Sequence, residues 1–172
     1  YYPTDVLVTA PEILFFWVAR MIMAGLRFMG RVPFHTVYLH GTARDTQHRR
    51  MSKSLGNGID PLDVVRRYGA DALRFTVING LAVGTDIILD PNDLETSFAS
   101  GRNFANKLWN VGRLVLTYAE AGDARAVSGD ELNRSDLQLA DRWIRSRLDH
   151  TIREATDHCE KFRLNDAVGA PY

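Results

Sequence analysis

Asp5-Val6-Leu7-Val8-Thr9 predicts a short buried strand, because the stretch is rich in β-branched residues and is bounded by Pro3 and Pro11. Thr36-Val37-Tyr38-Leu39-His40-Gly41 has the same character and predicts a second strand. Between them, residues 12–28 are apolar on nearly all sides, as expected of a helix that packs against a sheet. A strand, a helix and a second strand in this order predict a parallel βαβ unit with a right-handed crossover.

The ends of the predicted helix carry recognisable signals. Thr9-Ala10-Pro11-Glu12 has the T-x-x-E pattern of a capping box, and Gly30 and Pro33 are expected to end the helix. Ligands of parallel sheets bind at the carboxyl ends of the strands. Glu12 and the pair His40-Gly41 follow those ends, so we expect a ligand site there.

The loop Arg50-Met51-Ser52-Lys53-Ser54-Leu55-Gly56-Asn57 comes shortly after the second predicted strand. Arg50 and Lys53 can place positive charge on an anionic group, and serine hydroxyls can act as neutral donors. Gly56 allows the backbone to turn without steric cost. The chain is locally basic from Arg44 to Lys53, with Asp45 as the sole acid. A phosphate-holding loop and a merely solvated basic loop both fit these residues.

The rest of the chain is predicted to be largely helical. Asp60 and Pro61 predict a helix N-terminus, and residues 86–90 predict a short strand. Two apolar stripes at helical spacing then flank a polar loop over residues 122–133, which predicts an antiparallel helix pair. The stripes comprise Phe104, Leu108, Val111 and Val115, then Leu137, Ala140, Ile144, Leu148, Ile152, Ala155, Cys159 and Phe162.

Composition limits the classes of protein that fit. The 172 residues suit one domain or one and a fraction, and 21 basic residues balance 21 acidic ones, so any RNA contact must come from a local patch. One cysteine, Cys159, indicates a reducing compartment, and we expect the cytoplasm. The apolar run Ile13–Ala19 is too short to span a bilayer. Because the chain opens without methionine directly before a strand, we expect it to be a piece of a longer protein.

With these surroundings, Arg50-Met51-Ser52-Lys53-Ser54 resembles the KMSKS signature of class I aminoacyl-tRNA synthetases. Four further blocks occur in the right order and resemble the valine-specific members of that family: Tyr2–Thr9, Phe15–Met21, Tyr68–Phe75 and Arg102–Asn110. The resemblance covers essentially the whole chain. It implies an α/β fold, with the C-terminal part of a Rossmann-type catalytic domain over residues 1–90 and the first helices of an all-α anticodon-binding bundle over residues 91–172.

The resemblance also implies an activity: valine is activated with ATP, as its Mg²⁺ complex, and is then transferred to tRNA(Val). It implies no protein-bound metal, no membrane and no obligate protein partner. A HIGH-type motif is absent from the sequence, so we expect the 172 residues alone to be inactive. Two alternatives remain open, an isoleucyl- or leucyl-type synthetase and a non-catalytic RNA-binding module derived from a synthetase. A HIGH-type motif upstream would favour the enzyme.

Individual roles follow from the family's motif. The resemblance implies Lys53 and, ranked below it, Arg50 as catalytic residues, because Arg50 replaces the family's first lysine. The implied ATP-binding residues are Glu12, His40, Gly41, Met51, Ser52, Lys53, Ser54 and Asn57. Glu12 could equally serve the helix cap, His40 could be merely structural, and Asn57 could brace the loop. His48 departs from the glycine that the family commonly carries in the turn before the motif.

Ile13 and Trp17, four residues apart on the predicted helix, are implied to line the valine pocket, with ordinary core packing as the alternative. A polar stripe is implied to contact tRNA, although a solvated face would look the same: Asn103, Asn106, Lys107, Asn110 and Arg113. His150, Glu154 and His158 share a helical face beside Cys159, and we interpret them as solvated surface in preference to a metal site.

Overall fold

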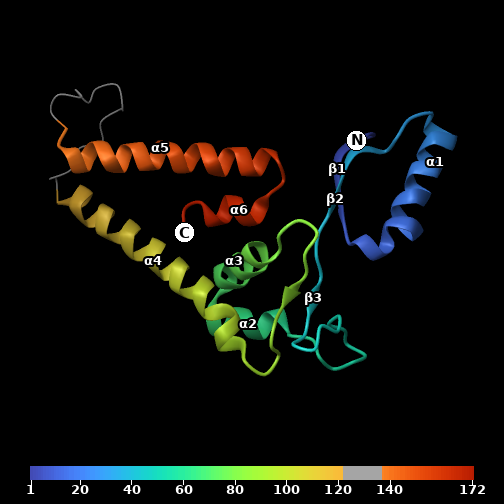
Figure 1. Cartoon of the computed structure of the whole chain (residues 1–172), viewed down its shortest axis with the longest axis horizontal. Coiled ribbons are helices and arrows are strands. Elements are labelled where there is room, and N and C mark those ends of the chain that lie inside the picture. The colour runs from blue at the N-terminus through green and yellow to red at the C-terminus, as the bar shows by residue number, and fades with distance from the viewer. Residues whose placement is uncertain (122–136) are drawn as a thin grey trace.

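The computed structural model describes residues 1–121 and 137–172. Its first unit contains strands β1 (Thr4–Thr9) and β2 (Phe34–Leu39), which pair in parallel with Val6 opposite Thr36 and Val8 opposite Tyr38. Helix α1 (Ala19–Met29) connects the two strands on the right of Figure 1. The parallel βαβ unit predicted from the sequence is therefore confirmed, and the α/β class with it. The predicted burial of the first strand is wrong, because Val6 and Val8 are 38% and 56% exposed.

The chain between β1 and α1 is not the continuous α-helix that the sequence predicts from Glu12. It forms a single 3₁₀ turn, η1 (Pro11–Ile13), and then a π-helical turn, η2 (Leu14–Val18), in which the amide of Ala19 donates to the carbonyl of Leu14. Helix α1 ends at Gly30, whose φ of 69° is left-handed, as predicted for a glycine at this place.

The predicted capping box at Thr9 and Glu12 is wrong. Thr9 is the last residue of β1, its carbonyl accepts from the amide of His40 at 3.0 Å, and the helical turn begins at Pro11. The N-cap is therefore Ala10, which has no side-chain acceptor. The hydroxyl of Thr9 instead donates to the carbonyl of Ala10 at 3.5 Å, so Glu12 is left without a capping partner.

A second small sheet follows the first. Strand β3 (Ala43–Arg44) pairs in parallel with β4 (Ile87–Ile88), and helices α2 (Pro61–Tyr68) and α3 (Ala70–Gly80) connect them. Asp60 caps α2 by accepting from the amide of Leu62 at 2.9 Å, as predicted. Strand β4 is shorter than the predicted 86–90, and the sequence did not predict β3.

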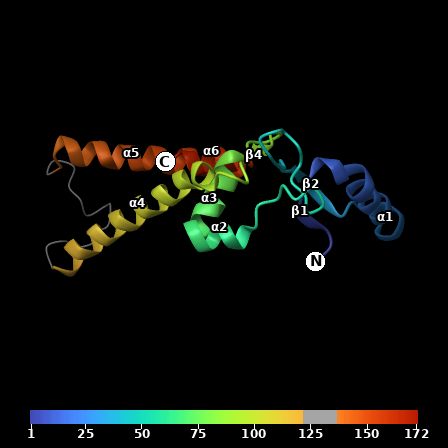
Figure 2. The same cartoon turned by 90° about the horizontal axis from the view of Figure 1, so that it is seen from below.

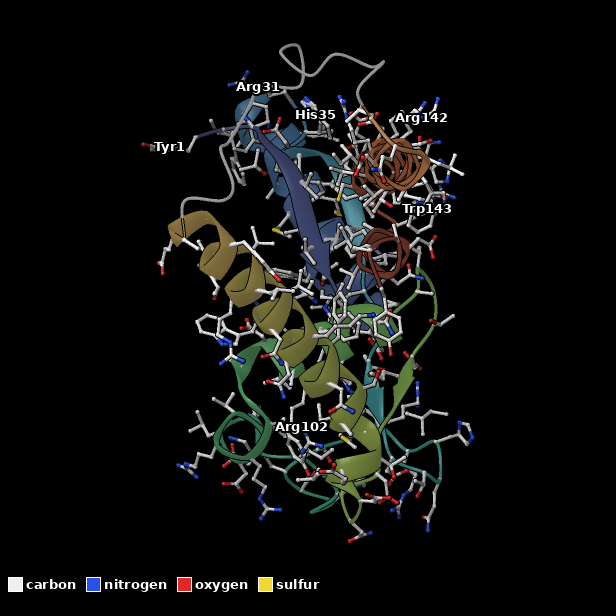
Figure 3. The ribbon with its side chains drawn as sticks, turned by 90° about the vertical axis from the view of Figure 1, so that its left-hand side faces the viewer. Tyr1, Arg31, His35, Arg102, Arg142 and Trp143 are labelled. Carbon is white, nitrogen blue, oxygen red and sulfur yellow. The ribbon has the colours of Figure 1, made fainter. Side chains whose placement is uncertain are left out.

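The best-packed core lies around this second sheet. Val64 of α2, Ile87 and Leu89 meet Phe98 of the long helix α4 (Leu94–Glu120), and Phe98 is only 1% exposed. At the lower end of α4 in Figure 3, Arg102 forms a bidentate ion pair with Glu95 and lies over the ring of Tyr68. The core thus crosses the predicted domain boundary at residues 90 and 91, which stays a prediction.

Helices α5 (Leu139–Glu160) and α6 (Leu164–Gly169) complete the described chain. Helix α6 packs on both α3 and α5, and in Figure 2 α4 and α5 run apart towards the left. The predicted antiparallel α4–α5 pair is therefore wrong. Helix α6 packs between α3 and α5, and Leu108 and Val115 on α4 and Leu148 on α5 are exposed. The predicted polar loop over residues 122–133 lies outside the described residues.

Two further observations concern the whole described chain. The rings of Tyr38 on β2 and Phe162, in the turn between α5 and α6, lie 5.8 Å apart and join the first unit to the helices. Among residues 1–121 and 137–172, we find no helix with the length and apolar character to cross a membrane.

Candidate functional site

The basic loop over residues 50–57 begins in a narrow hairpin. The amide of Met51 donates to the carbonyl of Ala43 at 3.0 Å, the amide of Asp45 donates to the carbonyl of Arg49 at 2.9 Å, and Arg44 and Arg50 form an antiparallel bridge. We call residues 43–51 the stem and residues 52–56 the tip. The stem turns at His48, which has a left-handed φ of 61°, and the tip turns at Gly56, with a φ of 65°. A left-handed φ favours glycine, so His48 holds a backbone conformation that residues with a side chain rarely adopt.

Asp45 is the centre of the stem, and sequence reasoning did not select it. Its side chain is buried, with the residue 3% exposed, and one carboxylate oxygen accepts from the amides of Gln47 and Arg49 at 3.0 and 2.9 Å. The other accepts from Arg49 Nε at 2.8 Å and from Asn57 Nδ2 at 2.9 Å. The bond from Asn57 is the main reason why the pKa of Asp45 lies far below its ordinary value. The signal in the sequence that could have identified Asp45 is that it is the one acid in the basic segment from Arg44 to Lys53.

Asn57 braces the loop from its other end. Its Oδ1 accepts from the amide of Ser52 at 2.9 Å, and its Nδ2 donates both to Asp45 and to the carbonyl of Arg50 at 3.3 Å. The residue is 8% exposed, so these bonds are largely shielded from water. Of the two roles left open for Asn57, bracing is the one that these contacts show.

A second carboxylate ties the stem to the sheet. Asp86, next to β4, accepts from the amide of Thr42 at 2.7 Å, from the hydroxyl of Thr42 at 3.0 Å and from Arg44 Nε. The amide of Thr42 is the largest cause that lowers the pKa of Asp86 to about 2. Arg44 also donates through Nη1 to the carbonyl of His48 at 3.1 Å, so it links Asp86 to the turn of the stem.

The backbone of the tip is held by hydrogen bonds, and its residues beyond Ser52 are exposed. Met51 is half-buried against the core around Val64 and Phe98. The hydroxyl of Ser52 lies 3.2 Å from that of Ser54 and accepts from the amide of Leu55 at 3.3 Å. Lys53 is exposed, and none of the ion pairs within the described ranges 1–121 and 137–172 involves it.

The cations of the basic segment from Arg44 to Lys53 therefore fall into two groups, those neutralised by a carboxylate and those available to a ligand. Arg44 is paired with Asp86 and Arg49 with Asp45, and in each pair the guanidinium also donates a hydrogen bond to the carboxylate. Arg50 Nη1 lies 3.8 Å from Glu12 Oε1, a loose pair between exposed side chains. Lys53 is left as the cation that an anion can approach at the lowest cost, and this arrangement suits the binding of phosphate oxygens.

The Glu12–Arg50 pair is the contact that brings two of the predicted sites together. It joins η1, at the carboxyl end of β1, to the last part of the stem. With the capping box absent, the alternative role that the sequence allowed for Glu12 is removed. Its carboxylate is half-exposed at the strand end, where ligands of parallel sheets bind.

His40 and Gly41 directly follow β2. The ring Nδ1 of His40 lies 2.7 Å from the carbonyl of Gly41 and can donate to it. A Cβ on Gly41 would lie 1.7 Å from the carbonyl oxygen of Thr85, so the glycine is required by a close approach of two backbone segments within the protein. This internal contact accounts for Gly41 without a nucleotide.

The α-helical spacing expected for Ile13 and Trp17 is wrong, because Ile13 ends a 3₁₀ turn and Trp17 lies in the π-helical turn. The two side chains are 42% and 45% exposed, so they are not ordinary core residues here. Single π-helical turns are frequent at functional sites. The assignment of both residues to an amino-acid pocket stays a prediction.

The polar stripe on α4 is exposed throughout, as a solvated face and an RNA contact both require, and it comprises Asn103, Asn106, Lys107, Asn110 and Arg113. An apolar groove lined by Leu108, Trp109 and Leu116 runs beside it, which the sequence did not indicate. On α5, His150 Nε2 lies 3.3 Å from Glu154. Within residues 1–121 and 137–172, no group of three or more His, Cys, Asp or Glu residues is placed to hold a metal.

Comparison with known proteins gives consistent matches. A family model described as tRNA synthetases class I (I, L, M and V) matches residues 1–90. A valine–tRNA ligase from Clostridium acetobutylicum is 50% identical over 172 residues, which are 100% of this chain and 19% of the relative. The ligase from Clostridium tetani is 49% identical over the same shares, and that from Treponema pallidum is 46% identical over 100% of this chain and 17% of its own.

The chain thus spans about a fifth of the length of the curated relatives that it matches. Among solved structures, a ternary complex of Agrobacterium radiobacter K84 agnB2 LeuRS with tRNA and LeuAMS aligns with a TM-score of 0.77 at 24% identity. The alignment covers 98% of this chain and 22% of that chain. At this identity the likeness concerns the fold, and it confirms the predicted α/β class.

Proposed function

The chain belongs to the class I tRNA synthetase family, and from this premise we propose that it is part of an enzyme that activates valine with ATP and transfers it to tRNA(Val). We call the proposed longer enzyme the parent protein. The choice of valine is supported by relatives at 46–50% identity that are named valine–tRNA ligases. The proposed compartment is the cytoplasm, on the strength of the single cysteine.

The proposed first step needs no covalent protein nucleophile. A carboxylate oxygen of valine attacks the α-phosphorus of ATP, which is supplied as its Mg²⁺ complex, and the bond from that phosphorus to the bridging oxygen breaks. Valyl-adenylate forms, and pyrophosphate leaves with the bonding electron pair. The protein contributes position and charge, so catalysis depends on contacts that strengthen as negative charge develops on the pyrophosphate.

The observation that carries the proposal is the state of Lys53. Asp86 and Asp45 neutralise Arg44 and Arg49, whereas Lys53 projects from the braced tip without an ion pair among the described residues. An ammonium held in this way can meet the leaving group in the transition state. Arg50 keeps a secondary catalytic role in the proposal, because its guanidinium is already close to Glu12.

The other assignments belong to the same proposal. The half-exposed carboxylate of Glu12 can accept from ribose hydroxyls, and His40 and Gly41 border the nucleotide at the end of β2. Met51, Ser52, Ser54 and Asn57 shape the tip around the phosphates. Ile13 and Trp17 line the valine pocket, where each methylene is worth about 1–3 kcal/mol of discrimination. The exposed stripe on α4 contacts tRNA, and this contact should weaken as salt rises.

The test is valine-dependent ATP–pyrophosphate exchange by the parent protein. We expect Lys53→Ala to lower the exchange rate by more than about tenfold, roughly the loss of one charge-assisted contact. Lys161→Ala is the matched control, because Lys161 is an exposed lysine at the C-terminal end of α5, where it is neutralised by a pair with Asp157 at 2.6 Å. The control should exchange at the wild-type rate.

Each other outcome has a definite meaning. An unchanged rate in Lys53→Ala would remove Lys53 from the mechanism. Exchange that depends on isoleucine or leucine in place of valine would assign the chain to a neighbouring member of the family. RNA binding by a parent protein that exchanges with none of the three amino acids would identify a non-catalytic module.

A further inference from the structure

The loop that carries Lys53 is closed at its base by one buried carboxylate, that of Asp45. We propose that Asp45 is a positioning residue for adenylate formation: through Asn57 it fixes the tip and so sets the place of Lys53. This inference rests on the proposed function, since it assigns Asp45 a part in the step that Lys53 is proposed to catalyse. Asp45 is not itself proposed to touch ATP.

The first argument is connectivity. Asp45 accepts from the amides of Gln47 and Arg49, which precede the tip, and from the side chain of Asn57, which follows it. One side chain therefore joins the two ends of the loop. Asp86, the carboxylate next to β4, accepts, among the described residues, only from Thr42 and Arg44, which both precede the tip.

The second argument is the path from Asp45 to Lys53. Asn57 Oδ1 accepts from the amide of Ser52, the residue directly before Lys53, at 2.9 Å. The amide of Gly56 donates to the carbonyl of Lys53 at 3.3 Å and closes the turn. With Ser52 and Asn57 fixed, the short segment between them has little freedom, so the backbone of Lys53 is held from both sides.

The third argument is that Asp45 has no capacity left for a ligand. Both oxygens already accept two hydrogen bonds each, from two backbone amides and from the side chains of Arg49 and Asn57. A buried carboxylate is tolerated only with such compensation. The charge of Arg49 and the four donors keep the carboxylate ionised, consistent with the lowered pKa of Asp45. Its contribution to the reaction must therefore pass through its neighbours.

The chemistry also requires aspartate and not its amide. Asparagine at this position would retain one acceptor oxygen and would turn an amino group towards Nε of Arg49 and Nδ2 of Asn57, which are donors themselves. Asp45→Asn conserves the shape and volume of the side chain but places its amide NH₂ against the donors of Arg49 and Asn57. The bond to Asn57 is lost, and the tip is released while the apolar core stays unchanged.

The experiment is a double-mutant cycle on valine-dependent pyrophosphate exchange, with Asp45→Asn, Lys53→Ala and the double variant made in the parent protein. We expect Asp45→Asn alone to lower kcat by between about tenfold and 100-fold, the effect of misplacing a catalytic group. The KM values for ATP and valine should change much less. In the Lys53→Ala background the same substitution should cost less than about twofold, because the group that it positions is gone.

Asp63→Asn is the matched control, since Asp63 lies on the exposed face of α2, where it pairs with Arg66 at 2.7 Å. It should leave exchange unchanged. If Asp45→Asn does not accumulate as folded protein, Asn57→Ser removes the same hydrogen bond between Asp45 and Asn57 from its donor side. We expect the same non-additivity with Lys53→Ala.

The outcomes separate this inference from the proposed function. Losses that multiply in the double variant would show a general structural effect and would overturn the role of Asp45, while a large loss in Lys53→Ala alone would leave the proposed function intact. An unchanged kcat in Asp45→Asn would also overturn the role of Asp45. Absence of exchange in the wild-type parent protein would overturn both.

Discussion

Gly41→Ala tests whether this glycine serves the fold or a nucleotide. The added Cβ would lie 1.7 Å from the carbonyl oxygen of Thr85 and 2.9 Å from Cδ2 of Leu81, whereas ordinary contacts begin near 3.4 Å. The backbone of Thr85 must therefore retreat by about 1.7 Å. Overpacking of this kind costs about 1–3 kcal/mol, and a lost backbone hydrogen bond costs about 1 kcal/mol more. We expect a local destabilisation of roughly 2–4 kcal/mol.

The bonds at risk are those that pair β3 with β4. The amide of Ile87 donates to the carbonyl of Thr42 at 3.0 Å, and that of Leu89 donates to the carbonyl of Arg44 at 2.8 Å. Amide hydrogen exchange of the parent protein without ATP, read by mass spectrometry on peptides covering residues 85–90, measures their opening. The protection of these amides should fall by between about 30-fold and 800-fold, since each 1.4 kcal/mol is a factor of ten.

Gly112→Ala is the control with the same chemistry and the opposite expected sign. Gly112 is exposed within α4, and a Cβ there would meet nothing within 4 Å. Alanine in a helix is favoured over glycine by up to about 1 kcal/mol, so exchange within α4 should slow while residues 85–90 are unaffected. Unchanged protection in Gly41→Ala, together with a weaker affinity for ATP, would refute the packing argument and assign the glycine to the nucleotide.

Three further predictions concern the carboxylates and the exposed aromatic residue. Glu12→Gln should weaken ATP binding severalfold in equilibrium titration but leave thermal stability nearly unchanged, because its pair with Arg50 is long and exposed; unaltered affinity would exclude a nucleotide contact. Trp17→Ala should raise the KM for valine more than that for ATP in pyrophosphate exchange, and equal effects would indicate unfolding. The pKa of Asp86 is depressed to about 2, so its stabilisation of the stem is complete above pH 4 and is lost as pH falls towards 2; protection factors at Ile87 should fall over that window in wild type and lack this step in Asp86→Asn.

Local signals predicted the parts of the fold that depend on neighbours in sequence. Richness in β-branched residues predicted β1 and β2, and Asp60 with Pro61 predicted the start of α2. Strand β3 was missed because it has only two residues and is stabilised by β4, far along the chain. The capping box failed for a related reason: the pairing of β1 with β2 keeps Thr9 in the strand, and this non-local contact outweighs the local T-x-x-E pattern.

In the site, too, features with local signals were predicted and non-local contacts were missed. The motif predicted which residues form the loop, and its letters directed attention to the cations. The buried acceptor that holds the loop was missed, because an aspartate among arginines is most often a surface ion pair. Only the structure shows that Asp45 accepts four hydrogen bonds and that Asn57 returns to it from beyond the tip.

The two cations of the motif have different surroundings, and this difference bears on the arginine at position 50, where the motif that the loop resembles has lysine. Arg50 belongs to the stem, where its backbone bridges Arg44 and its carbonyl accepts from Asn57. From this fixed base its side chain approaches Glu12. A planar guanidinium suits such a carboxylate contact at least as well as an ammonium does. Lys53 instead belongs to the tip, where its exposed and flexible side chain can bring a compact charge to the pyrophosphate of the proposed reaction. The geometry therefore tolerates arginine at position 50 more readily than at position 53, and Lys53→Arg should impair exchange more than Arg50→Lys does.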